Sequence, residues 1–132
     1  EYAITASHGI PEVVIRGGTI EGTVGITCGK MTMEDGYIEA ASPLGVVLLN
    51  NNGKFEMSGG HIKNTDTQTE IRDELCAVNG SRTYNADVHE YISISGGTLE
   101  SINGPALYLA PANLVKTSLK ADISGNEAEI SK

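Results

Sequence analysis

One short phrase recurs along the chain and constrains its fold more than any other feature. The phrase runs apolar, polar, apolar, polar, a glycine pair or its substitute, then polar, apolar, polar. Its copies occupy Val13–Gly22, Met31–Ala40, Phe55–Asn64, Ile92–Ser101 and, in degenerate form, Ala121–Ile130. Repetition of one phrase in one direction is typical of stacked repeats, which must match only where they touch.

Each phrase alternates with period two before its glycines, as strands do. Glycine tolerates positive φ and has no side chain, so a strand can bend there while its neighbours approach closely. A helix would lose about 1 kcal/mol at each such glycine. We therefore expect one set of residues to face a common core: Val13, Ile15, Ile20, Met31, Met33, Ile38, Phe55, Met57, Ile62, Ile92, Ile94 and Leu99.

A second, shorter apolar element separates the phrases. It appears at Val24–Cys28, Gly45–Leu49, Leu75–Val78 and Ala106–Leu109, while the links between elements vary in length. Such variation suits a stack of coils. We expect residues 1–132 to form a single all-β domain, a parallel β-helix (β-solenoid) of about five to six irregular coils. Because the chain starts at Glu1 without a leader-like segment, it is expected to be a fragment of a longer chain.

Two antiparallel folds, a β-sandwich and a β-barrel, compete with this expectation. Both predict hairpin turns, and Asn52-Gly53, Asn79-Gly80 and Asn103-Gly104 suit such turns. These turns join unlike elements, whereas like phrases repeat in the same direction, which favours parallel stacking. Helical spacing occurs only at Thr69–Val78, which is expected to make at most one or two turns.

The two cysteines test how the short apolar elements align with one another in the stack. Alignment of these elements places Ile26, Val46, Cys76 and Leu107 in one inward row and Cys28, Leu48, Val78 and Leu109 in the next. Cys28 and Cys76 would then be two coils apart, about 9.6 Å from strand spacing. A disulfide needs a Cα separation below about 7 Å. Both thiols are therefore expected to be buried and not to pair with each other.

Composition restricts the partners. The net charge of −8 disfavours binding to nucleic acid or to an anionic membrane surface. No apolar run approaches the ~20 residues of a membrane span, so no membrane insertion is expected.

The phrases M-S-G-G-H-I and I-S-G-G-T-L, each followed by a short apolar element, carry a resemblance to a known group. They resemble the glycine-rich right-handed parallel β-helix repeats of bacterial surface (adhesin-like) proteins and phage fibres, within the pectate-lyase-like group. The resemblance covers about Ile4 to Ile130. It implies a coiled scaffold but no particular activity, because the group includes adhesins, lyases, glycosidases and viral spikes.

In-register stacking would align outward residues in ladders about 4.8 Å apart. One ladder would hold Thr19, Tyr37, His61, Thr98 and Glu127, and the other Glu21, Glu39, Lys63, Glu100 and Glu129. Lys63 would relieve repulsion between its two acidic neighbours. The plain interpretation is a solvated acidic face. The sharper one is a surface for a cationic partner or a weak Ca²⁺ site, although one carboxylate per coil supplies too few oxygens.

No catalytic constellation stands out. The aspartates are not paired, the three histidines are scattered, and metal, thiol-redox, nucleophile-elbow and phosphate-loop motifs are absent from the sequence. A spatial triad leaves no such trace. We therefore favour a protein that is not an enzyme, with no cofactor and no metal.

The longest links, Thr65–Glu74 and Gly80–Tyr91, lie between the third and fourth phrases. Long links on a rigid scaffold often carry recognition. The second link has the mixture that is enriched in contact surfaces, although its tyrosines would equally suit packing on the coil beneath. The candidate binding residues are Arg82, Tyr84, Asn85, His89 and Tyr91.

Together these features predict a non-catalytic extracellular module of a bacterial surface protein, for adhesion or for binding a glycan or a host-surface protein. The alternative is an oligomeric fibre or spike segment of a phage, located on the virion. A polysaccharide lyase or hydrolase comes third. Open strand edges at both ends predict either that the natural protein continues on both sides or that copies associate end to end, side by side or as a trimer.

Overall fold

The computed structural model describes residues 2–9, 11–50, 53–67, 70, 74–82, 92–109 and 121–131. In this part of the chain the only regular structure is strand, β1 to β11, and no helix occurs. Every recorded pairing between strands is parallel. The all-β, parallel expectation is confirmed, and the antiparallel sandwich and barrel are wrong.

The strands form two sheets. The first contains short strands in the order β1 (Tyr2–Ala6), β3 (Thr23–Thr27), β5 (Val47–Asn50), β8 (Val78–Arg82) and β10 (Leu107–Leu109). The second contains, in order, β2 (Glu12–Glu21), β4 (Lys30–Ala40), β6 (Lys54–Met57), β9 (Ile92–Ser101) and β11 (Ala121–Ser131). In this sheet β7 (His61–Asn64) continues the row of β6 and also lies between β4 and β9.

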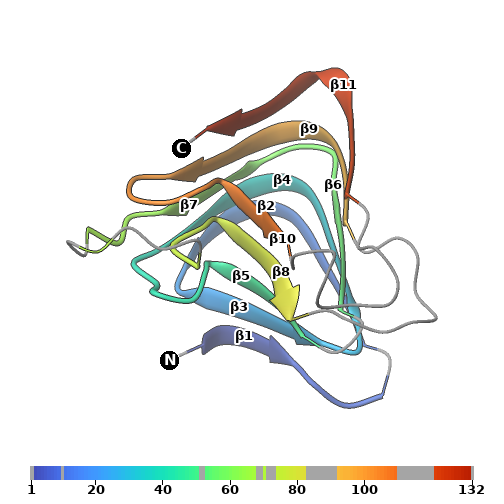
Figure 1. The fold of residues 1–132 in the computed structure, drawn as a ribbon. Coiled ribbons are helices and arrows are strands. Elements are labelled where there is room, and N and C mark those ends of the chain that lie inside the picture. The colour runs from blue at the N-terminus through green and yellow to red at the C-terminus, as the bar shows by residue number, and fades with distance from the viewer. Residues whose placement is uncertain are drawn as a thin grey trace.

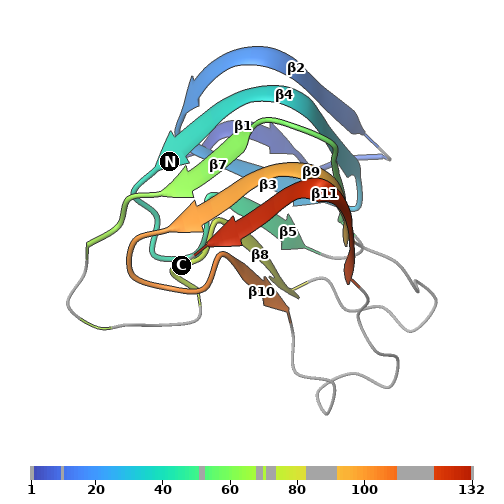
Figure 2. The same cartoon turned by 90° about the horizontal axis from the view of Figure 1, so that it is seen from above.

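The chain alternates between the two sheets as it advances from β1 and β2 to β10 and β11. Figures 1 and 2 show the long strands of the second sheet arching over the short strands of the first. Each phrase of the sequence supplies one strand row of the second sheet, and each shorter element contributes to the first. The core lies between the sheets.

Register in the second sheet follows the phrases. Met57 pairs with Met33 on one side and with Ile94 on the other, and Ile62 pairs with Ile38 and Leu99. All six of these side chains are at most 2% exposed. Burial of each contributes about 1.5–3 kcal/mol, so these continuous rows supply much of the stability. The predicted inward set is confirmed.

The glycine bend is confirmed at the same place in successive strands. Gly60 and Gly97 have φ of 87° and 90°. A Cβ on Gly97 would lie 2.8 Å from the Gly60 oxygen and 2.6 Å from the Met57 methyl carbon. Glycine is therefore required both by its backbone conformation and by the approach of the neighbouring strand.

The last strand departs from the predicted ladders. Ile123 pairs with Ile94 but Glu127 pairs with Gly96, so β11 spans 127 − 123 = 4 positions where β9 spans 96 − 94 = 2. Glu129 consequently aligns with Thr98, and Ser131 aligns with Glu100. The predicted placement of Glu127 beside Thr98 and of Glu129 beside Glu100 is wrong because β11 holds two extra residues at its bend.

The predicted rows of the first sheet are also wrong. Val24 pairs with Val47, Val47 with Val78, and Val78 with Leu107. Ile26 therefore lies beside Leu49 and not beside Val46. The physical reason is that β5 and β8 start later than their apolar runs, and Leu75–Ala77 form bends before β8. Of the Thr69–Val78 stretch the structure describes Glu70 and Glu74–Val78, and these residues form no helix.

The cysteine expectation is half right. Cys28 and Cys76 do not form a disulfide. Cys76 is fully buried, whereas Cys28 lies beyond the end of β3, exposed, at a φ of 58°. The predicted burial of Cys28 is wrong because β3 ends one residue before it and the chain turns outward there.

Candidate functional site

The outer face of the second sheet brings together five of the predicted ladder residues on three adjacent strands. We call this group the polar ladder: Tyr37 and Glu39 on β4, His61 and Lys63 on β7, and Glu100 on β9. Tyr37 pairs in register with His61, and Glu39 with Lys63, which pairs with Glu100. Strand alternation sets this arrangement, since Ile38, Ile62 and Leu99 point into the core.

The ladder side chains contact one another across the strands. The Tyr37 hydroxyl donates a hydrogen bond to Glu39. His61 Nε2 lies 2.9 Å from Glu100 Oε2, and Lys63 Nζ lies 3.3 Å from Oε1 of the same carboxylate. The Tyr37 and His61 rings meet edge to face, with centroids 5.1 Å apart. The group is half-buried and held in place by its own contacts.

Lys63 was expected to reduce the repulsion between Glu39 and Glu100, and this expectation is met for Glu100. Its recorded ion pair is with Glu100, whereas Glu39 accepts the tyrosine hydrogen bond. Glu21, which pairs in register with Glu39, is exposed on the next strand.

The contacts shift two pKa values. The hydrogen bond to Glu39, together with desolvation and the nearby carboxylates, raises the pKa of Tyr37 to about 12. Desolvation alone would raise the pKa of Glu100, but the hydrogen bonds and charges of Lys63 and His61 lower that pKa below its usual value. The tyrosine is thus kept protonated and Glu100 ionised near neutral pH.

A broad hollow adjoins the ladder at the corner where β2, β4 and β7 end. We call it the corner hollow; it has a volume of about 490 Å³. It is lined by Glu21, Gly22, Thr23, Glu39, Ala40, Ala41 and Thr65. Glu39 therefore belongs to both the ladder and the hollow, and Thr65 is the first residue of the long Thr65–Glu74 link.

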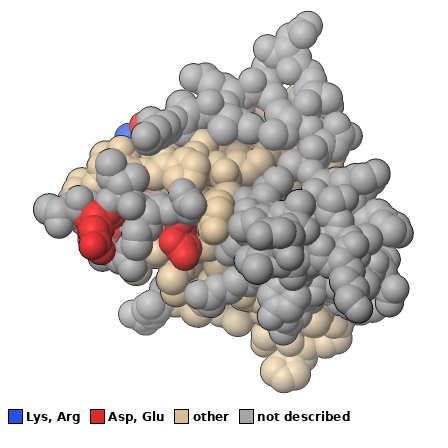
Figure 3. All heavy atoms as spheres, viewed as in Figure 1, with Lys and Arg blue, Asp and Glu red and all other residues tan. Residues whose placement is uncertain are grey.

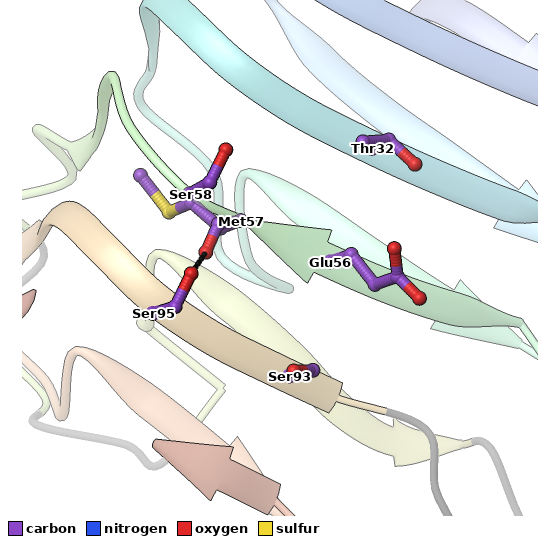
Figure 4. A pocket seen from close by; sticks show the side chains of 6 residues that line it. All are labelled: Thr32, Glu56, Met57, Ser58, Ser93 and Ser95. Atoms are coloured by element: carbon purple, nitrogen blue, oxygen red, sulfur yellow. Dashed lines mark hydrogen bonds between the residues drawn. The ribbon is translucent and has the colours of Figure 1, made fainter. Parts of the chain in front are cut away.

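A smaller groove of about 120 Å³ lies on the other arm of the same sheet face (Figure 4). It is lined by Thr32, Glu56, Met57, Ser58, Ser93 and Ser95. Glu56 is engaged by Lys30 at 2.9 Å, and the Ser95 hydroxyl donates to the Met57 carbonyl at 3.5 Å. This hydroxyl-lined groove was not predicted from the sequence, although the polar positions of the phrases before the glycines could have indicated it.

The structure locates one of the predicted loop residues in part. Arg82 ends β8, where its backbone pairs with Asn50, and its side chain is outside the described part. Tyr84, Asn85, His89 and Tyr91 lie outside the described residues. The structure therefore does not show whether these residues gather.

Asn64 anchors the start of the long link, a role that sequence reasoning missed. Its side chain is 1% exposed, donates to the carbonyls of Ser42 (2.8 Å) and Cys76 (3.0 Å), and accepts from the Asp66 amide (3.0 Å). The neighbouring position in the next strand, Ser101, donates from its hydroxyl to the Leu75 carbonyl. A polar residue at an inward phrase position was the available signal.

Other site classes find no support in the described residues. They contain no group of three or more His, Cys, Asp or Glu placed to hold a metal. None of them forms a helix long and apolar enough to span a membrane. On the face that Figure 3 shows, the described acidic side chains appear as separate spots and not as one continuous patch.

Comparison of the chain with family models, curated proteins and solved structures gives no match.

Proposed function

We propose that the two-sheet parallel stack is a β-solenoid of about five to six irregular coils that serves as a non-catalytic binding module. Its setting is extracellular, on a bacterial cell surface, and its ligand is a glycan. The module displays the polar ladder, the corner hollow and the links at residues 65–91 on one rigid support.

The observation that carries this proposal is the fixed geometry of the polar ladder beside the corner hollow. Sugar hydroxyls are donors and acceptors, and they are bound by ionised carboxylates and by aromatic rings whose positions are set before binding. Glu39 is held by Tyr37, and Glu100 is held by His61 and Lys63. Because these side chains are already ordered, less entropy is lost when a ligand binds.

Charge narrows the ligand class. The corner hollow is lined by Glu21 and Glu39, and no cation is among its described lining residues. Like charges would repel a uronate or another acidic sugar. The preferred glycan is therefore neutral or carries an amino group.

The electrostatics of the ladder disfavour glycoside hydrolysis. A hydrolase of that kind needs one carboxyl whose pKa is raised so that it can protonate the leaving group. The pKa of Glu100 is lowered instead. A binding role fits an ionised carboxylate better than an acid role does.

The long links complete the proposed site. Thr65 lines the corner hollow, so the Thr65–Glu74 link begins at its rim. The candidates in the next link, Arg82, Tyr84, Asn85, His89 and Tyr91, remain part of the proposal as a second contact region.

A glycan array and calorimetry on selected hits test the proposal. The wild-type chain is compared with Glu39→Gln, which removes a charge at the shared position, and with Ser93→Ala, a matched control on the other arm of the sheet. We expect binding of neutral or amino glycans, lost at least about tenfold in Glu39→Gln and unchanged in Ser93→Ala, since a lost charged hydrogen bond costs about 1.5–3 kcal/mol. Wild-type protein that binds no glycan, or equal affinity in all three proteins, contradicts the proposed function.

A further inference from the structure

His61 lies within the polar ladder, and the two nitrogens of its ring can take opposite roles in hydrogen bonding. Its strand, β7, lies between β4 and β9, and its register partners are Tyr37 and Thr98. The Tyr37 ring packs against the His61 ring edge to face, with centroids 5.1 Å apart. The His61 side chain is still 34% exposed. The ring is therefore held by its neighbours and open to a ligand.

The contact with Glu100 defines which nitrogen of the ring carries the proton. His61 Nε2 lies 2.9 Å from Glu100 Oε2. Lys63 Nζ lies 3.3 Å from the other oxygen of this carboxylate, and Glu100 is ionised near neutral pH. An ionised carboxylate only accepts hydrogen bonds, so Nε2 must be the donor. In the neutral ring Nδ1 is then unprotonated and acts as an acceptor.

The second ring nitrogen, Nδ1, is accessible. Among the described residues, Thr32 Oγ1 is the one side-chain nitrogen or oxygen that is buried and has no hydrogen-bond partner. No partner of His61 Nδ1 is recorded in that part of the chain, so Nδ1 is not buried. The ring lies on the face of the sheet that carries Glu39 and Glu100. A ligand at the ladder thus meets a hydrogen-bond acceptor close to two carboxylates.

We infer that His61 determines the specificity of the polar ladder: its Nδ1 atom accepts a hydrogen bond from an ammonium group, so near neutral pH the ladder prefers an amino glycan to the equivalent neutral glycan. This inference rests on the proposed function, since it names which glycan the same site prefers. The ladder contains two carboxylates and one lysine, so its net charge is −1 when His61 is neutral. An ammonium group donates to Nδ1 and is also attracted by this charge, whereas a hydroxyl group only donates.

Protonation of His61 removes this preference. Histidine is the side chain that ordinarily changes charge between pH 5 and 8. A protonated ring donates from both nitrogens and brings the net charge of the ladder to zero, so it repels an ammonium group. A sugar hydroxyl can instead accept from Nδ1. Tyrosine, lysine and glutamate side chains ordinarily keep their charge state between about pH 5.5 and 7.5. The groups that face the ring are Tyr37 and Glu39 on β4, Lys63 on β7, and Thr98 and Glu100 on β9.

Nitrogen-15 NMR of the His61 ring tests the hydrogen-bond geometry without any glycan. Long-range proton–nitrogen spectra distinguish protonated from unprotonated ring nitrogens, and comparison with a His61→Gln variant identifies the signals. At about pH 7.5 we expect Nε2 to carry the proton and Nδ1 to be unprotonated. The opposite tautomer, or a ring protonated at both nitrogens at this pH, would overturn the inference and leave the proposed glycan site intact.

Calorimetry with two tetrasaccharides tests the preference itself. A chain of four glucosamine units and the matching chain of four glucose units differ only in an amino or a hydroxyl group on each ring. We expect the glucosamine chain to bind more tightly at about pH 7.5 and to lose affinity at least about fivefold at about pH 5.5, with less than about a twofold change for the glucose chain. Acid also protonates the sugar amines, which favours binding to carboxylates, so the expected loss is specific for a charge gained by the protein.

His61→Gln is the matched variant, because its side-chain amide still donates to Glu100 but has no ring nitrogen that titrates. We expect it to bind the glucosamine chain more weakly than wild type at about pH 7.5 and to lose no further affinity at about pH 5.5. His8→Gln removes an exposed histidine that lies beside the Ser7 hydroxyl, away from the ladder, and should keep the wild-type pH profile. Since both side chains are at least one-third exposed, both variants should keep the thermal unfolding midpoint of wild type.

Two binding results would overturn the inference. They are a glucosamine chain that binds no better than the glucose chain at about pH 7.5, and a folded His61→Gln variant that keeps the wild-type pH profile. Either result leaves the proposed function standing if other glycans on the array bind. The proposed function itself fails only when no glycan binds or when Glu39→Gln has no effect, so the two failures are distinguishable.

Discussion

The two sheets of this molecule differ in how well their register could be predicted from the sequence. In the middle of the second sheet the pairing runs Met33–Met57–Ile94 before the glycine bend and Ile38–Ile62–Leu99 after it without a shift, whereas β11 has two extra residues at its bend. The short strands of the first sheet have no such marker. The difference teaches that a backbone feature, and not apolar character alone, fixes which residue lies beside which.

The substitution with the largest expected effect removes the glycine at the bend. Gly97→Ala places a Cβ against the backbone of Gly60 and imposes a positive φ on alanine. We expect a loss of roughly 3 kcal/mol or more in the free energy of unfolding, because backbone strain and a clash act together. Gly18→Ala is the control, since it has a φ of 80° but open space, and it should lose only about 1–2 kcal/mol. Equal losses in urea unfolding would show that the close approach of strands is not important.

The next prediction compares the loss of stability on truncating one core residue in each sheet. Met57→Ala in the second sheet and Leu49→Ala in the first each remove a side chain that is at most 2% exposed. Each should lower the free energy of unfolding by about 2–5 kcal/mol. Both substitutions act on one core between the sheets, so unfolding should remain a single transition. Two separated transitions in denaturant would contradict a shared core.

A smaller effect tests the anchor of the long link. Asn64→Ala leaves the carbonyls of Ser42 and Cys76 and the Asp66 amide without the Asn64 side chain. We expect a loss of about 1–3 kcal/mol, together with faster hydrogen exchange at Asp66 than at Met33. Unchanged exchange at Asp66 would mean that Asn64 does not hold the link.

The polar ladder gives an effect of pH. The folded-state pKa of Glu100 is lowered, so its contribution to stability is present above its ordinary pKa of 4.5 and is lost as the pH falls through the lowered value. The stability difference between wild type and Glu100→Gln should therefore shrink as the pH drops below 4.5. The stability contributed by Tyr37 depends on pH in the opposite direction. The pKa of Tyr37 is raised to about 12, so its contribution to stability is present below pH 10 and is lost as the pH rises towards 12. Ultraviolet titration of wild type against Tyr37→Phe checks this, and a Tyr37 titration near 10 would contradict the hydrogen bond to Glu39.

The smallest effect distinguishes the two thiols. Cys28 is exposed and Cys76 is fully buried, so a thiol reagent should label Cys28 rapidly and Cys76 only after unfolding. Cys28→Ser should remove the rapid phase with little change in stability. Rapid labelling of both cysteines in the folded protein would contradict the burial of Cys76.

Most of the second sheet could be predicted from the sequence, because periodicity two and the glycine bend together specify which residues face inward and which strands align. The first sheet could not, since runs such as Gly45–Leu49 are apolar throughout and fit more than one register. The shift within β11 was missed because its phrase lacks the second glycine, and Gly125-Asn126 gives no indication of two extra residues at the bend.

The candidate site was predicted in part. Alternation was enough to place Tyr37, Glu39, His61, Lys63 and Glu100 on one face, but the choice of partners depended on side-chain reach, which a sequence pattern does not contain. For the same reason Asn64 was missed: its role depends on carbonyls from two distant turns that come together only when the strands stack.

The most direct test of the account is a measurement of which strands flank Met57. Nuclear Overhauser contacts in uniformly labelled protein should connect the backbone of Met57 with Met33 on one side and with Ile94 on the other, in the pattern of parallel strands. Close Hα–Hα contacts between Met57 and an antiparallel partner, or the absence of either neighbour, would contradict the parallel stack on which the polar ladder depends.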